Sequence, residues 1–172
     1  YHVTRGGISR YKKFEWFVEN VVAGQAGPNL DELLAAYAAE VKHGLLTCDI
    51  AEGLTELREE TRHANWLIVS GGDQLEIREV FAIRDIAKYF DRGIFGSPDG
   101  KDEILKRELS NGNIKPDALF IGDSRFDYEV SVAEGLDFVF MYGWTEVRAW
   151  KEWVARENIQ YQRSLSCLML CT

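Results

Sequence analysis

One stretch constrains the fold more than any other: residues 117–127, with the sequence DALFIGDSRFD. A short apolar run ends in Gly122 and Asp123, and a second carboxylate, Asp127, follows four residues after the first. Runs of this kind are typical of buried strands in parallel sheets, and ligands of open α/β folds bind at the carboxyl edge of such sheets. Two carboxylates at that edge suit a hard divalent cation, whereas an ordinary Asp N-cap explains this stretch alone equally well.

Two further stretches suit phosphate binding. Residues 66–73 form a second apolar run, which ends in Ser70, Gly71 and Gly72 just before a helix start. Backbone N–H groups at such a turn, together with the helix N-terminus, form an anion site. Lys101 begins a third helix after a glycine-rich loop, where it can neutralise a phosphate oxygen or hold a carboxylate ionised. The alternatives are an ordinary strand-to-helix turn after Ser70 and a solvated side chain for Lys101.

The order strand-Ser, loop-Lys and strand-Gly-Asp-x-x-x-Asp resembles the second, third and fourth motifs of the haloacid dehalogenase (HAD) phosphohydrolase superfamily. The likeness covers roughly residues 45–155, includes the segments 69–74, 89–98 and 133–136, and is greatest to the phosphoglycolate-phosphatase-like branch with a helical cap. This resemblance implies an α/β fold: a three-layer α/β/α Rossmann-like core with a parallel sheet.

The resemblance also implies a role for each motif residue. Asp123, with Asp127, would hold Mg²⁺ as the cofactor. The Ser70 hydroxyl and the Gly71 N–H would bind a phosphoryl oxygen, and Lys101 would offset the negative charge that develops in phosphoryl transfer. Ser70, Lys101, Asp123 and Asp127 would then be the catalytic residues, and the substrate a small phosphorylated metabolite.

The first motif of the family, a strand ending in Asp-x-Asp that supplies the nucleophile and the general acid/base, has no counterpart in the sequence. The nearest candidate, residues 45–51, has Ala51 where an acid is required, and we interpret Asp49 as the turn before a helix. We therefore expect a truncated or degenerate, inactive phosphatase and leave open whether the chain is an enzyme. In the family the missing strand is central, so we also expect unpaired sheet edges and a homo-oligomer formed through them.

Two other functions remain open: a non-catalytic phosphate-binding or protein-interaction module on the same scaffold, and a mutase-like or dehalogenase-like activity on the same fold. A net charge of −8 argues against a nucleic-acid partner. No apolar run approaches the roughly 20 residues that span a bilayer, so no membrane partner is expected. Three cysteines without C-x-x-C spacing indicate a reducing, cytoplasmic compartment.

Hydrophobic periodicity divides the chain into a partial helical cap (1–44), an α/β core (45–157) and a C-terminal tail (158–172). The cap is expected to contain helices from residue 8 to 22 and from Asn29 to Gly44, the second opened by a capping box with Glu32. Basic residues near the first of these helices, Arg10 among them, either meet an anionic substrate or form a solvated helix face. In the core we predict helices over 52–63, 73–90, 101–109, 126–134 and 145–157 and strands over 65–69, 93–96, 117–121 and 137–141.

Overall fold

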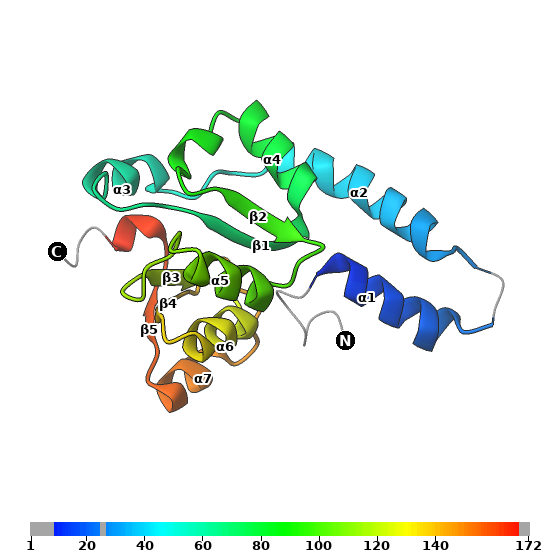
Figure 1. Ribbon diagram of the computed structural model, residues 1–172. Helices are drawn as coiled ribbons and strands as arrows, with labels where there is room; N and C mark the ends of the chain where they lie inside the picture. Colours follow the sequence, from blue (N-terminus) through cyan, green and yellow to red (C-terminus); the bar gives the residue numbers. More distant parts are fainter. Residues whose placement is uncertain (1–8, 25–26, 169–172) are drawn as a thin grey trace. The chain divides into compact units, whose positions relative to one another are not determined.

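Helices alternate with short parallel strands along most of the chain (Figure 1). The computed structural model describes residues 9–24 and 27–168. Within these ranges the chain forms two compact units, which we describe separately: unit 1 contains residues 50–65 and 101–168, and unit 2 contains residues 9–49 and 66–100. The predicted helix start at residue 8 and the cysteine at position 171 lie outside the described residues.

Unit 2 contains a parallel pair of strands, β1 (Ile68–Asp73) and β2 (Ile94–Ser97). Helix α4 (Gln74–Ile83) and the short 3₁₀-helix η2 (Ala87–Tyr89) connect them. The predicted continuous helix over 73–90 is therefore wrong. Helix α4 ends at Ile83 because the backbone turns at Arg84 and then reaches a positive φ of 55° at Asp85, which an α-helix does not accommodate.

A helical hairpin precedes this strand pair in unit 2. It consists of α1 (Arg10–Phe17), a π-helical turn η1 (Val18–Val22) and α2 (Leu30–Thr47). The predicted capping box of Asn29 and Glu32 is confirmed. The predicted end of the second helix at Gly44 is wrong, because Arg84 of the α4 segment donates hydrogen bonds to the carbonyl groups of Leu45 and Cys48 and so satisfies the end of a longer helix.

Unit 1 contains a parallel sheet of three strands in the order β3 (Leu119–Gly122), β4 (Asp137–Met141) and β5 (Gln160–Gln162). Its helices are α3 (Leu54–Glu60), α5 (Lys101–Ser110), α6 (Arg125–Ala133) and α7 (Trp150–Glu157), followed by a 3₁₀ turn, η3 (Leu165–Cys167). Strand β5 was not predicted and lies in the segment assigned to the tail. Its three residues, Gln-Tyr-Gln, are too few and too polar to give a strand pattern.

Aromatic side chains form the core of unit 1 under helix α7. Phe140 and Trp153 are buried and meet edge to face, with ring centroids 5.1 Å apart. Trp153 and Val154 of α7 are buried in this core, and Trp150 packs against it. Trp144 is instead exposed, because α7 begins at Trp150 and not near residue 145.

The predicted α/β class with parallel strands is confirmed. The domain boundaries at residues 44 and 157 stay predictions. In the described part of the chain, β3 pairs with β4 on one side only, and its Leu119 and Ile121 side chains are 50% and 37% exposed.

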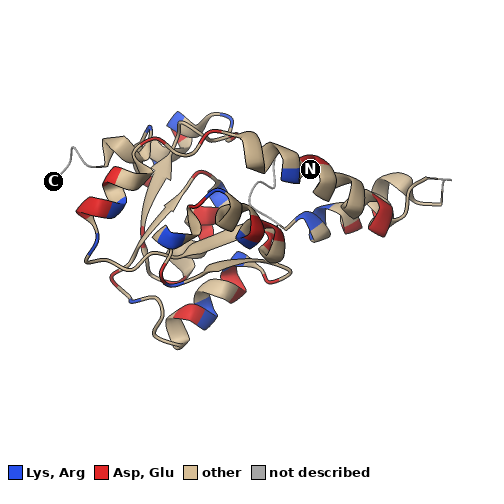
Figure 2. Cartoon of the chain, turned by 90° about the horizontal axis from the view of Figure 1, so that it is seen from above, with Lys and Arg blue, Asp and Glu red and all other residues tan. Residues whose placement is uncertain are grey.

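Charged residues of both signs are interspersed along the helices, as Figure 2 shows. No helix within the described ranges is both long and apolar enough to cross a membrane. The predicted cytoplasmic location and the predicted absence of a nucleic-acid partner stay predictions.

Candidate functional site

A cluster of charged and hydroxyl side chains lies at the carboxyl end of β3 in unit 1. Lys101 is the first residue of α5, and Asp127 lies in the first turn of α6, 2% exposed. The Lys101 ammonium group forms an ion pair with Oδ1 of Asp127. Oδ2 of Asp127 accepts hydrogen bonds from the N–H and the hydroxyl of Ser124, at 3.2 and 2.7 Å. Both carboxylate oxygens are thus engaged, as burial of a charge requires.

Ser124 also fixes the helix that carries Asp127. It is the N-cap of α6, and its hydroxyl oxygen accepts the N–H of Asp127 at 3.1 Å, which completes a capping box. A negative charge in the first turn of a helix is favourable, and this is one part of the role of Asp127. The same carboxylate holds the lysine of a neighbouring helix, so it does more than stabilise its own helix.

Asp123 lies between β3 and the N-cap of α6. Burial raises the pKa of its carboxyl group, the nearby charge of Asp127 raises it further, and the ammonium group of Lys101 lowers it in part. The backbone carbonyl of Asp123 accepts a hydrogen bond from Thr145, whose side chain follows β4, at 2.5 Å. The cluster therefore has one carboxylate tied to a lysine and a second whose negative charge is incompletely balanced.

A divalent cation would balance that charge. Among the described residues there is no group of three or more His, Cys, Asp or Glu side chains able to enclose a metal. Mg²⁺ does not need such a cage, since it usually keeps several waters and binds through one or two carboxylates plus substrate phosphate oxygens. Asp123 fits this chemistry best, because both oxygens of Asp127 already contact protein groups.

The predicted phosphate-binding residues form a second group, in unit 2. Ser70 and Gly71 lie in the last part of β1, where the strand register is irregular between Val69 and Asp73. The Ser70 hydroxyl oxygen accepts the N–H of Gly72 at 3.0 Å, and such an oxygen can still donate its own proton. The fully buried Ser97 of β2 donates to the Gly71 carbonyl at 2.9 Å, which holds this segment against its neighbour.

The structure thus brings Lys101, Asp123 and Asp127 together in unit 1 and places Ser70 and Gly71 in unit 2. The catalytic and binding roles of all five stay predictions. Asp49 lies exposed in the loop between α2 and α3, as its interpretation as a turn residue required.

Sequence reasoning missed Ser124 and Thr145. The Ser-x-x-Asp spacing of a capping box could have revealed the first. The Thr145 hydroxyl donates to a backbone carbonyl 22 residues earlier, and no local pattern signals such a contact. One of the two alternatives predicted for Arg10, a solvated helix face, is wrong. Arg10 is buried and forms an ion pair with Glu76.

No family model matches the sequence, and no curated protein sequence matches it either. Solved structures do match. The chain superimposes on a predicted phosphatase from Clostridium acetobutylicum with a TM-score of 0.69 and 18% identity, over 90% of this chain and 72% of the other. It superimposes on a haloacid dehalogenase-like family hydrolase from Streptococcus pneumoniae with a TM-score of 0.67 and 19% identity, over 92% and 76% of the two chains.

The chain has a haloacid dehalogenase-like fold. A third match, a HAD-superfamily hydrolase from Ehrlichia chaffeensis, has a TM-score of 0.54 and 18% identity, and covers 95% of this chain and 87% of the other. The HAD-like fold explains why carboxylates gather after β3, since open α/β sheets bind ligands beyond the carboxyl ends of their strands. At these identities the matches establish the fold, and the chemistry has to be argued from the residues.

Proposed function

We propose that this chain carries the metal-binding and phosphate-binding residues of a Mg²⁺-dependent phosphomonoesterase that acts on a small phosphorylated metabolite. One observation carries the proposal: Asp123 lies beside the ion pair of Lys101 and Asp127 at the carboxyl end of β3. An ion pair at the protein surface would be exposed, but the side chains of Lys101 and Asp127 are only 11% and 3% exposed. The HAD-like fold and the likeness to a predicted phosphatase support the same conclusion.

Each residue of the cluster has a task in this proposal. Asp123 would hold Mg²⁺, which when bound shields the charge between an anionic nucleophile and an anionic phosphate. Lys101 supplies a fixed positive charge to a phosphoryl oxygen. Asp127 keeps the ammonium group of Lys101 in place, and Ser124 keeps Asp127 in place. Positioning and electrostatic stabilisation of this kind dominate phosphoryl transfer.

Phosphate recognition is assigned to the end of β1. The Ser70 hydroxyl and the Gly71 N–H are the donors for a phosphoryl oxygen. The hydrogen bond from Ser97 to the Gly71 carbonyl holds the backbone on the C-terminal side of these donors in place. A rigid donor needs no reorganisation when negative charge arrives, which is what makes backbone donors effective in phosphate sites.

None of these residues is a nucleophile for phosphorus. Phosphate-monoester hydrolysis requires accelerations up to ~10²¹-fold, and phosphate-binding groups alone provide a small part of that. We therefore infer that these 172 residues do not hydrolyse a phosphate ester by themselves, and that catalysis would need an Asp-x-Asp strand in addition to them.

The test compares two proteins: this chain and a longer in-frame product that includes an Asp-x-Asp strand ahead of it. Hydrolysis of para-nitrophenyl phosphate is measured with Mg²⁺ and with a chelator. We expect metal-dependent turnover by the longer protein, loss of that turnover in its Asp123→Asn variant, and no turnover by the shorter chain. A longer protein with an upstream Asp-x-Asp but without metal-dependent turnover would contradict the proposal.

A second candidate, a non-catalytic interaction module, is favoured by the open edge of β3. Its backbone groups on one side pair with no strand in the described part of the chain, and Leu119 beside them is half exposed. Such an edge is a template for pairing with another strand. We propose that a second copy of this chain occupies it, which makes the chain a homo-oligomer.

A further inference from the structure

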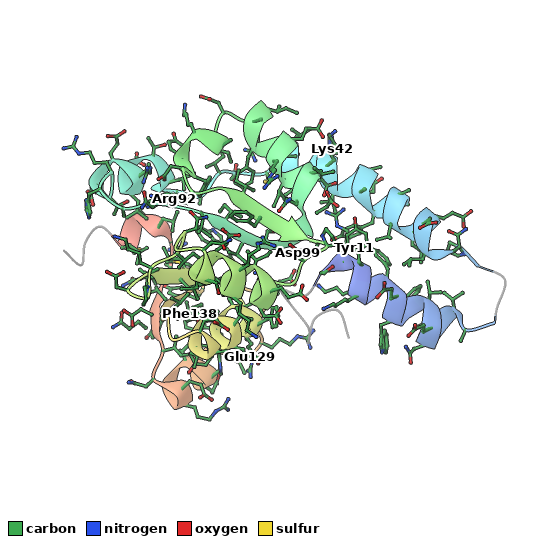
Figure 3. The ribbon with its side chains drawn as sticks, in the orientation of Figure 1. Tyr11, Lys42, Arg92, Asp99, Glu129 and Phe138 are labelled. Atoms are coloured by element: carbon green, nitrogen blue, oxygen red, sulfur yellow. The ribbon has the colours of Figure 1, made fainter. Side chains whose placement is uncertain are left out.

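Helix α4 contacts both helices of the hairpin, α1 and α2, through acidic residues three positions apart in the sequence. In unit 2, Asp73, Glu76 and Glu79 stand at the beginning and on one side of α4. Tyr11 of α1 donates its hydroxyl proton to Oδ2 of Asp73 at 2.8 Å, and Arg10 forms an ion pair with Glu76. Lys42 of α2, which like Tyr11 is labelled in Figure 3, donates to both carboxylate oxygens of Glu79 at 2.8 Å.

The contacts that α4 makes with α1 are more buried than those it makes with α2. The side chains of Arg10 and Glu76 are 9% and 10% exposed, whereas those of Lys42 and Glu79 are 41% and 52% exposed. Exposed ion pairs contribute little, and breaking a buried one is costly. The α1 contacts are therefore the strong ones, and they lie at the end of α4 that follows β1.

Asp73 connects these contacts to the proposed phosphate-binding segment. It is the last residue of β1, three residues after Ser70, and its Oδ1 accepts the N–H of Glu76 at 3.0 Å as the N-cap of α4. Its carboxylate is thus shared between the helix it caps and the phenol hydroxyl of Tyr11. Burial acts to raise the pKa of the Asp73 carboxyl group, but its hydrogen bonds and the charge of Arg10 together outweigh burial and lower the pKa.

The β1 segment has little room to adjust on its other side. A Cβ at Gly96 of β2 would lie 2.4 Å from the carbonyl oxygen of Gly72, so the two backbones are in close approach there. Ser97 holds the Gly71 carbonyl from the same strand. With β2 on one side and Tyr11 holding Asp73, the peptide units of Gly71 and Gly72 are fixed at both ends.

We propose that Tyr11 and Arg10 are positioning residues: by holding Asp73 and Glu76, they set the geometry of the Ser70–Gly72 backbone and couple the helical hairpin to phosphate binding there. This proposal rests on the proposed function, which assigns phosphate to that segment. Tyr11 touches no reacting group in it and acts through Asp73. An anion bound at Gly71 and the hairpin attached at Asp73 then stabilise the same backbone conformation, so each favours the other.

The test uses the full chain labelled with ¹⁵N-glycine and two matched variants. Tyr11→Phe removes the hydroxyl that contacts Asp73. Tyr37→Phe removes a hydroxyl from the same hairpin but keeps the contacts of the Tyr37 ring with Phe14 and Arg10. The measured quantities are the amide resonances of Gly71 and Gly72 and their response to inorganic phosphate.

We expect Tyr11→Phe to shift both amide resonances and to weaken phosphate binding about threefold to tenfold, a part of what a hydrogen bond to a charged group is worth. Tyr37→Phe should change neither. Unshifted Gly71 and Gly72 resonances in a folded Tyr11→Phe variant would overturn the positioning role. Unchanged resonances of the unsubstituted chain on addition of phosphate would instead overturn phosphate binding at this segment, while the comparison of the variants still decides the role of Tyr11.

Discussion

Asp127 occupies the space that a side chain at Gly122 would need. A Cβ on Gly122 would lie 2.5 Å from the Cβ of Asp127 and 2.9 Å from its Oδ2. The glycine of the Gly-Asp-x-x-x-Asp pattern is thus required by the packing of a buried carboxylate five residues later. Because Gly122 has no side chain, Asp127 in the first turn of α6 can pack against the end of β3. Its carboxylate therefore lies beside that of Asp123.

Gly122→Ala should therefore destabilise the fold by about 1–3 kcal/mol, the usual cost of inserting a methyl group into a packed site. The matched control is Gly44→Ala, since nothing lies within 4 Å of a Cβ there and Gly44 is inside helix α2. That control should gain up to about 1 kcal/mol from helix propensity. Urea unfolding of the two variants measures both changes, and equal stabilities would contradict the packing argument.

Lys101→Met should cost about 3–5 kcal/mol of folding stability, because it leaves the buried charge of Asp127 without its partner. Replacing both partners, with Lys101→Met and Asp127→Asn together, should cost less than the sum of the two single changes. Denaturant unfolding of the four proteins in this cycle measures the coupling. Additive effects would mean that the two side chains do not interact.

Asp123→Asn should raise the thermal stability at neutral pH in the presence of a chelator. The folded-state pKa of Asp123 is raised by burial, so its ionised form costs stability. That cost is fully present above the raised folded pKa and disappears as the pH falls toward the ordinary value of the unfolded chain. The melting temperatures of the variant and the unsubstituted chain should thus converge on acidification.

Asp117→Asn is the control for that experiment, since Asp117 is an exposed carboxylate ahead of the same strand. It should leave the melting temperature nearly unchanged at every pH. A stabilisation by Asp123→Asn that persists unchanged at acidic pH would contradict an origin in the charge of Asp123.

The proposed self-association through β3 predicts a dimer or larger species in sedimentation. Leu119→Lys should shift the chain toward monomer, because lysine on an edge strand opposes pairing. Val132→Lys, at a 52% exposed position on α6, should have no such effect. A clean monomer of the unsubstituted chain over a wide concentration range would contradict the proposal.

Local patterns predicted β1 to β4 and the lysine and carboxylates of the site, but they missed β5. Apolar runs closed by glycine placed β3 and β4 nearly correctly, and the capping box of Asn29 marked the start of α2. Helix ends were less predictable, because they depend on distant partners. The side chain of Arg84, for example, extends α2 by satisfying carbonyl groups 36 and 39 residues earlier.

The contacts around the site residues were the least predictable part. The Lys101–Asp127 pair joins residues 26 positions apart, and the Arg10–Glu76 pair joins residues 66 positions apart. A solvated helix face was the more economical interpretation of Arg10, because a lone arginine on a helix gives no local sign of burial. Only the fold brings a carboxylate to it.

Above all, we propose that Asp123 holds Mg²⁺ beside the Lys101–Asp127 pair. Calorimetric titration of the chain with Mg²⁺, with and without inorganic phosphate, tests it most directly. We predict binding that phosphate strengthens and that Asp123→Asn abolishes, with Asp117→Asn leaving it intact. Binding that is absent from the unsubstituted chain, or equal in the Asp123→Asn variant, would contradict the claim.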